Sequence, residues 1–221
     1  MRQDVEEALR RIQVLTHSSI RISAGSDGPV LYLDPYEVQG EPKDADVIFF
    51  THSHYDHFSP DDFRKLMKED TMFVMPQSMI KEAAEAGITD SRIVSAEPGE
   101  SSEVCGIPVF AVPAYNVGKK FHPKENRWVG YLLSIHGVRI YVAGDTDANP
   151  ENRNVLCDIA LVPAGGTYTF TPEEAADFVN EIHPEAAIPT HYGTVAGTPA
   201  DGKKFAARVN PDIAVKLCLF Q

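Results

Sequence analysis

Short runs of hydrophobic residues, separated by polar and turn-forming segments, recur along the whole chain, and each run predicts a β-strand. The predicted strands span residues 12–15, 19–22, 30–33, 47–50, 104–112, 129–135, 138–143, 158–162, 186–188 and 213–219. Helices are predicted at residues 3–11, 77–86 and 203–208, and two more begin at Ser59 and Thr171. Ser59 suits a helix cap, with a proline and two acids after it. Thr171 and Glu174 have the residue types of a capping box.

The order of these elements predicts the architecture. Many strands come first with helices among them, and strand–helix alternation follows toward the C-terminus. Because the hydrophobic face of a sheet must be covered by another layer, we expect an α/β fold of two β-sheets with helices packed outside them. The length of 221 residues suits one domain over residues 1–221.

Composition narrows the classes of partner and compartment. The formal net charge of −12 repels phosphate backbones and acidic lipid surfaces, so neither nucleic acid nor a membrane is an expected partner. Cys105, Cys157 and Cys218 form no C-x-x-C pair, and the N-terminal residues carry acids where a signal peptide has an apolar run. We therefore expect a cytoplasmic protein, and a homo-oligomer stays open.

The densest group of chemically active side chains is Thr51-His52-Ser53-His54-Tyr55-Asp56-His57, directly after the predicted strand 47–50. Histidine and carboxylate are ligands for zinc and similar metals. An extended segment would turn His52, His54 and Asp56 to one side, and a bend into the next helix would bring His57 to a second metal. A histidine-rich surface loop is the alternative, but such a loop would not need a buried strand before it and a helix start after it.

Two later strands end in the same way. Residues 138–143 run into Gly144-Asp145, and residues 186–188 run toward Thr190-His191. Loops at strand ends are where functional side chains converge in such sheets. Alone, Asp145 would be interpreted as a turn residue and His191 as a loop histidine, but together with the first cluster both become candidate metal ligands.

These motifs carry a resemblance to a known family. The segment 52–57 matches the H-x-H-x-D-H signature of the metallo-β-lactamase superfamily, and Asp145 and His191 match its later metal motifs in the same order. The chain is most similar to the branch that resembles ascorbate-6-phosphate lactonase, through residues 33–35, 112–116, 165–169 and 188–193. The resemblance runs from about residue 12 to the C-terminus.

The resemblance implies an αβ/βα four-layer sandwich with two divalent metal ions at one edge, zinc first, with manganese or iron as alternatives. The implied ligands are His52 and His54 for the first metal, Asp56, His57 and His191 for the second, and Asp145 between them. Asp56 and Asp145 would also be catalytic residues. A metal-bridging hydroxide would then cleave an ester, lactone, amide or phosphodiester bond, since bound metals lower the pKa of water to near neutrality.

One ligand of the family pattern is missing from its usual place. A third histidine normally serves the first metal from the loop after the strand that ends at residue 112, where this chain reads Pro113-Ala114-Tyr115-Asn116. His122 and the amide oxygen of Asn116 are the two candidates. We favour His122 because zinc prefers nitrogen and sulfur ligands.

The same loop bears on the substrate. Lys119, Lys120, Lys124 and Arg127 lie close together in an acidic chain, which favours a small anionic substrate; a solvated surface loop is the alternative. The expected substrate-binding residues are Lys119, Lys120, Asn116 and Tyr192. Asp34 is expected either to orient a metal ligand or to form a turn, and His17 to be structural or exposed.

The leading hypothesis is therefore a two-metal hydrolase acting on a small, anionic molecule. A nuclease or phosphodiesterase acting on nucleic acid is the alternative enzyme, which the net charge disfavours. A redox enzyme with iron in the same cage is a further alternative. A non-catalytic metal-binding protein of the same fold is the alternative outside enzymes.

Overall fold

The structure is a computed structural model in which residues 1–220 are described, and its strands pair into two mixed sheets. The first sheet contains, side by side in chain order, β1 (Ile12–Thr16), β2 (Ser19–Ser23), β3 (Val30–Leu33), β4 (Ala45–Phe49), β5 (Met67–Pro76) and β6 (Ile93–Ala96). The second contains, in reverse order, β13 (Ala214–Val215), β12 (Ala186–Thr190), β11 (Ile159–Pro163), β10 (Val138–Val142), β9 (Val129–Ile135), β8 (Ile107–Pro113) and β7 (Ser101–Val104).

Helices flank these sheets. The α-helices are α1 (Gln3–Arg10), α2 (Pro60–Leu66), α3 (Ile80–Glu85), α4 (Pro172–Ile182) and α5 (Asp201–Arg208). Short 3-10 helices are η1 (Gln77–Met79), η2 (Asp90–Arg92), η3 (Lys124–Asn126) and η4 (Asn152–Asn154). Among residues 1–220, no helix has both the length and the apolar character that crossing a membrane requires.

One half of each sheet is parallel. Strands β3 to β6 pair in parallel in the first sheet, and β10 to β13 do so in the second, whereas the remaining neighbours are antiparallel. Parallel neighbours end at the same edge of a sheet, where loops can bring side chains together. The predicted ligand segments follow β4, β10 and β12, so each leaves one of these carboxyl edges.

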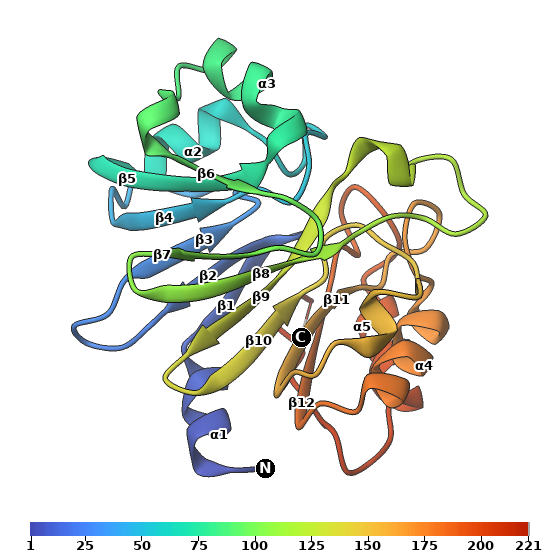
Figure 1. Ribbon diagram of the computed structural model, residues 1–221. Helices are drawn as coiled ribbons and strands as arrows, with labels where there is room; N and C mark the ends of the chain where they lie inside the picture. The colour runs from blue at the N-terminus through green and yellow to red at the C-terminus, as the bar shows by residue number, and fades with distance from the viewer. Residues whose placement is uncertain (221) are drawn as a thin grey trace.

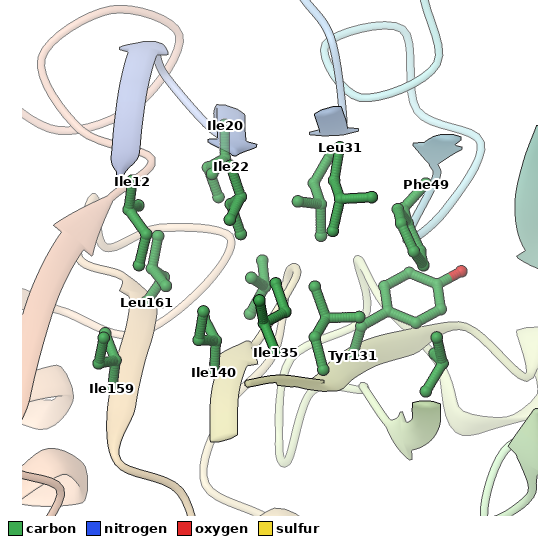
Figure 2. Close-up of a cluster of buried hydrophobic side chains, with 14 of the residues drawn as sticks. Ile12, Ile20, Ile22, Leu31, Phe49, Tyr131, Ile135, Ile140, Ile159 and Leu161 are labelled. Atoms are coloured by element: carbon green, nitrogen blue, oxygen red, sulfur yellow. The ribbon is translucent and has the colours of Figure 1, made fainter. Parts of the chain in front are cut away.

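The main core lies between the sheets. Figure 2 shows branched aliphatic and aromatic side chains of one sheet facing those of the other: Ile12, Ile20, Ile22, Leu31 and Phe49 against Tyr131, Ile135, Ile140, Ile159 and Leu161. The hydroxyl of Tyr131 crosses this layer and donates a hydrogen bond to the carbonyl oxygen of Phe50, 2.6 Å away. Tyr131 therefore ties the second sheet to the residue that directly precedes the first ligand segment.

Two outer layers complete the sandwich. Helices α2 and α3 cover the outer face of the first sheet, and α4 and α5 cover that of the second (Figure 1). Phe63 of α2 packs edge to face on Phe73 of β5, and Phe178 of α4 stacks on Phe170. Burial of these apolar faces stabilises the layers, and the arrangement confirms the predicted αβ/βα fold.

Some predicted elements differ from the observed ones. The predicted strand 104–112 is a hairpin, because Cys105 and Gly106 adopt positive φ angles of 48° and 75° and form the turn between β7 and β8. The predicted closing strand 213–219 shrinks to the two residues of β13. Strands β5 and β6 were not predicted, and β5 begins with polar, exposed positions that hide its buried second half.

Both predicted helix starts are confirmed, because α2 begins directly after Ser59 and α4 directly after Thr171, but their side-chain caps differ. At Thr171 the capping box is present, since its hydroxyl accepts from the Glu174 amide and the Glu174 carboxylate accepts from the Thr171 amide. At Ser59 the expected cap is wrong, because the hydroxyl donates to the carboxylate of Asp62 instead.

Asp62 fastens the loop after β3 to helix α2. Its carboxylate accepts hydrogen bonds from the backbone amides of Glu37 and Val38, both 2.9 Å away, and from the ammonium group of Lys65. Burial by itself would raise the pKa of Asp62, but the hydrogen bonds from Lys65 and Ser59 and from the two amides outweigh burial and lower the pKa. The ionised carboxylate is therefore the form that the fold stabilises.

Candidate metal centre

Five loops bring histidines and carboxylates to one place at the edge of the sheets. Residues 52–57 follow β4, Asp145 follows β10, His191 follows β12, His122 lies in the loop from β8 to β9, and His17 lies in the turn between β1 and β2. All of the grouped side chains are buried except that of His54, which is half-buried. The residues that the sequence predicted as ligands are thus near one another in the structure.

Three histidines form the first group. The ligand atoms of His52, His54 and His122 all lie within 4.8 Å of one another. The Nε2 atom of His52 is 3.0 Å from Nδ1 of His54, and Nε2 of His122 is 3.2 Å from Oδ2 of Asp145. These separations suit ligands around one ion.

The second group is built on two carboxylates. The Nε2 atoms of His57 and His191 each lie 3.8 Å from Oδ2 of Asp56. The same two nitrogens approach Asp145, at 3.4 Å from Oδ1 for His57 and 3.0 Å from Oδ2 for His191. Asp145 therefore contacts both groups, as a carboxylate shared between two metals would.

The unpaired buried atoms test whether these residues fit metals. Among the described residues, Nε2 of His57, His122 and His191 and Oδ1 of Asp145 are buried without a hydrogen-bond partner. Leaving a buried polar atom unpaired costs roughly 1–3 kcal/mol each, so such a set needs a compensating ligand. Histidine nitrogens with carboxylate oxygens are a donor set that zinc, iron and manganese accept. The residues therefore fit two divalent ions.

Burial and neighbouring side chains shift the pKa values of two groups in the centre, His52 and Asp145. Burial lowers the pKa of His52 well below its usual value, which leaves a neutral ring with a free nitrogen lone pair. Burial alone would raise the pKa of Asp145, but the neighbouring His191 and His57 outweigh it and hold that pKa well below the usual range. An ionised, acceptor-only Asp145 is the form that binds cations.

Asp34 fixes the orientation of His57. One oxygen of its carboxylate lies 2.8 Å from Nδ1 of His57, and the carboxylate also accepts hydrogen bonds from the amide and the hydroxyl of Thr51. A proton on Nδ1 leaves Nε2 of His57 with its lone pair toward Asp56 and Asp145. Asp34 was expected either to orient a metal ligand or to form a turn, and in the structure its carboxylate contacts the candidate ligand His57.

Asn116 and His122 have different positions in the centre. The amide oxygen of Asn116 accepts from the backbone amide of His122 at 3.0 Å and lies 3.1 Å from Nδ1 of its ring. The amide nitrogen of Asn116 donates to Asp147 and to the carbonyl oxygen of Tyr168. Asn116 is therefore engaged in holding His122, while Nε2 of His122 faces Asp145.

His17 also lies in the second group, with Asp56, His57 and His191, although its place in the sequence did not indicate this. Its ring is fully buried, with Nε2 3.1 Å from Oδ2 of Asp56 and Nδ1 3.1 Å from the hydroxyl of Thr194. Burial lowers the pKa of His17 to about 4, so the ring is neutral, and the acceptor-only carboxylate of Asp56 requires the proton on Nε2. The available signal was its position: like His191 after β12, His17 directly follows the strand β1.

Two glycines allow the loops to approach this closely. Gly144 has a φ of 64°, and a Cβ there would lie 3.0 Å from the side chain of Thr51. A Cβ at Gly165 would collide with the carbonyl oxygen of His191. A side chain at either position would displace a loop of the metal centre.

Comparison with known proteins identifies the family. The sequence profile of the beta-lactamase superfamily domain matches residues 11–191. The chain belongs to the beta-lactamase superfamily. The superfamily resemblance is therefore confirmed, while the likeness to the ascorbate-6-phosphate lactonase branch stays a prediction.

Relatives of this superfamily member include two archaeal proteins. A UPF0173 protein of Pyrococcus abyssi is 32% identical over 80% of this chain and 81% of its own length. A UPF0173 metal-dependent hydrolase of Thermococcus onnurineus is 29% identical over 88% of this chain and 90% of its own. A crystal structure from Parabacteroides distasonis, named for a metal-dependent hydrolase, superposes with a TM-score of 0.76 at 28% identity, covering 93% of this chain and 91% of the other.

A pocket of about 250 Å³ opens directly over the metal centre of this beta-lactamase superfamily member. Its residues are His54, Tyr55, Asp56, Phe121, His122, Asp145, Tyr168, His191 and Val195. The candidate ligands form its base, and three aromatic rings with Val195 form its walls. A substrate reaching the metals would pass these side chains.

All four predicted substrate-binding residues lie outside this lining. The ammonium group of Lys119 is bound to Asp147 and to the carbonyl oxygen of Thr169, each 2.7 Å away. Tyr192 is fully buried, and its hydroxyl donates to the carbonyl oxygen of Leu219. Lys120 is exposed and does not line the pocket. Asn116 also lies outside the lining, behind His122.

Proposed function

We propose that this chain is a dinuclear metal-dependent hydrolase that cleaves an ester, lactone, amide or phosphodiester bond of a small molecule. The observation that carries the proposal is the position of Asp145, whose carboxylate contacts His122 of one group and His57 and His191 of the other. Relatives named as metal-dependent hydrolases support the reaction class. We take zinc as the first candidate metal, with manganese or iron as alternatives.

The proposed ligand sets follow the two groups. His52, His54 and His122 would hold the first ion, Asp56, His57 and His191 the second, and Asp145 both. Bound there, divalent ions would polarise the scissile bond and acidify a water molecule. Asp34 holds the proton of His57 on Nδ1, and His17 donates to Asp56, so both keep a ligand in its binding form.

The charge of the substrate is a narrower part of the proposal. Lys119 is occupied by Asp147, so attraction of an anion would come from the two metal ions, which outweigh Asp56 and Asp145 in charge, and from the exposed Lys120. We propose that a negatively charged substrate turns its charged group toward the metals. The three free thiols agree with the cytoplasmic location proposed for the chain.

Metal analysis and hydrolysis assays test the proposal together. We expect about two zinc ions per chain by elemental mass spectrometry, and turnover of at least one member of a panel of carboxylic esters, lactones and phosphodiesters. His54→Ala and Asp145→Ala should lose metal and turnover while remaining folded. His183→Ala is the control, since the side chain of His183 is exposed and pairs with the exposed Asp212, away from the metal centre.

Other outcomes separate the alternatives. Two metals with no turnover of any substrate would favour a non-catalytic metal-binding protein. Cleavage of single- or double-stranded nucleic acid at physiological salt would favour the nuclease, against the expectation from the net charge of −12. Failure to bind any divalent metal would refute the proposed function.

A further inference from the structure

The walls of the pocket above the metal centre are unusually aromatic for a solvent-facing surface. Tyr55 is 66% exposed, Phe121 38% and Tyr168 37%. These are three of the eight large hydrophobic side chains exposed among residues 1–220, and all three line this one pocket. Single exposed apolar residues need no explanation, but a cluster rimming a concave site indicates binding.

The aromatic side chains are held close to the metal centre by the chain itself. Tyr55 lies between His54 and Asp56 in the sequence, and Phe121 directly precedes His122. Tyr168 comes from the separate loop between β11 and α4, and its ring packs edge to face on that of Phe121, with 4.8 Å between centroids. This packing gives the pocket a preformed wall.

The walls of the pocket carry no cationic side chain that could bind a negatively charged group. Neither lysine nor arginine lines the pocket, and the nearby Lys119 is bound to Asp147. Val195 adds an aliphatic surface to the three rings. The volume of about 250 Å³ lies below the roughly 300–1,000 Å³ typical of pockets for drug-sized ligands, so the bound group is small.

We propose that Tyr55, Phe121, Tyr168 and Val195 form a subsite for an uncharged aromatic group attached next to the bond that is cleaved. Aromatic walls bind such a group by apolar burial and by edge-to-face contacts. The inference rests on the proposed function and narrows it: the apolar side of the substrate lies in this subsite, and the scissile group lies at the metals.

Binding of two small zinc-chelating probes tests the subsite without requiring turnover. Acetohydroxamate and benzohydroxamate carry the same chelating group and differ in a methyl or a phenyl substituent. On zinc-loaded protein, titration calorimetry should show benzohydroxamate binding about tenfold more tightly or better, as expected for burial of one ring. Tyr168→Ala should reduce this ratio to about two or less while leaving acetohydroxamate affinity unchanged.

Matched variants separate the ring from other causes. Tyr168→Phe keeps the ring and should keep the ratio, and Leu156→Ala removes an exposed apolar side chain elsewhere (68% exposed) and should change neither affinity. Phe121→Ala should act like Tyr168→Ala, because the two rings form one wall.

The remaining results would contradict the subsite, the direct role of Tyr168 or the proposed function. Equal affinities of both probes for the wild-type protein would overturn the subsite while leaving the hydrolase proposal intact. An unchanged ratio in both alanine variants would overturn it as well. Loss of both affinities in Tyr168→Ala with zinc still bound would mean that Tyr168 acts through the metal centre. If the protein bound neither probe, the proposed function and the subsite would both fail.

Discussion

Replacement of Asp34 by asparagine tests how the protein prepares His57 for metal binding. The Asp34 carboxylate accepts from Nδ1 of His57, from the amide of Thr51 and from its hydroxyl, at 2.7–2.8 Å. Asparagine has nearly the same shape and tolerates the positive φ of 46° at this position, so the backbone should persist. However, an amide offers one acceptor atom and one donor atom where the carboxylate offers two acceptors.

The geometry gives the size of the effect. If the amide oxygen stays on the Thr51 amide, the amide nitrogen faces Nδ1 of His57, so two donors oppose each other. Relief requires moving the proton of His57 to Nε2, which removes the lone pair directed at Asp56 and Asp145. A buried donor without an acceptor costs about 1–3 kcal/mol. We therefore expect the second metal to bind about 10–100-fold more weakly, as for other residues that orient metal ligands.

Zinc titration against a competing chelator measures the affinity of the second metal. Tryptophan fluorescence reports metal binding to the first group, His52, His54 and His122. Trp128 is the only tryptophan, and its ring centroid lies 4.9 Å from those of His52 and His54. Its fluorescence titration should change little in Asp34→Asn. Asp61→Asn makes the same chemical change at a side chain that is 97% exposed and serves as the control. If Asp34→Asn held the second metal as tightly as the control, the tautomer argument would be wrong.

Further variants test other contacts. His17→Phe should weaken binding of the second metal about tenfold, because Asp56 loses the hydrogen bond from His17. Metal content per chain after dialysis measures this loss. His122→Ala should leave about one metal per chain by elemental mass spectrometry. Asp62→Ala should lower the free energy of unfolding by about 2–4 kcal/mol at pH 7 in urea titrations, since the buried amide of Val38 and the part-buried amide of Glu37 lose their acceptor. The pKa of Asp62 is lower in the folded state than its unfolded value of about 3.9. Its contribution to the free energy of unfolding is therefore present above that unfolded value and disappears as pH falls through the folded pKa. The difference in stability between Asp62→Ala and wild type should accordingly shrink below about pH 4.

Much of the candidate site could be predicted because its signals are local. His52, His54, Asp56 and His57 follow a buried strand within a few residues, so one hydrophobic run locates them all. Parallel strands carry their carboxyl ends to a common edge, which also made the position after β10 predictable. The same reasoning from hydrophobic runs gave the order of layers.

Other features depend on contacts between distant segments. His17 is 39 residues from Asp56, and nothing near it in the sequence indicates that pairing. Lys119 looked like a free cation because its partner Asp147 is 28 residues away. The β7–β8 hairpin was hidden for a different reason: Val104 and Ile107, on either side of the turn, are both apolar and look like one continuous strand.

The arrangement of the pocket limits how its specificity can change. Tyr55 and Phe121 are sequence neighbours of candidate ligands, so a substitution that shifts their loops would also shift His54, Asp56 or His122. Tyr168 stands on a loop without candidate ligands; its carbonyl oxygen accepts from Asn116, and its ring packs on that of Phe121. A side-chain change at Tyr168 can therefore reshape the pocket without moving a ligand. If the subsite is as proposed, substitutions at Tyr168 should change substrate preference with less effect on metal affinity than substitutions at Tyr55 or Phe121.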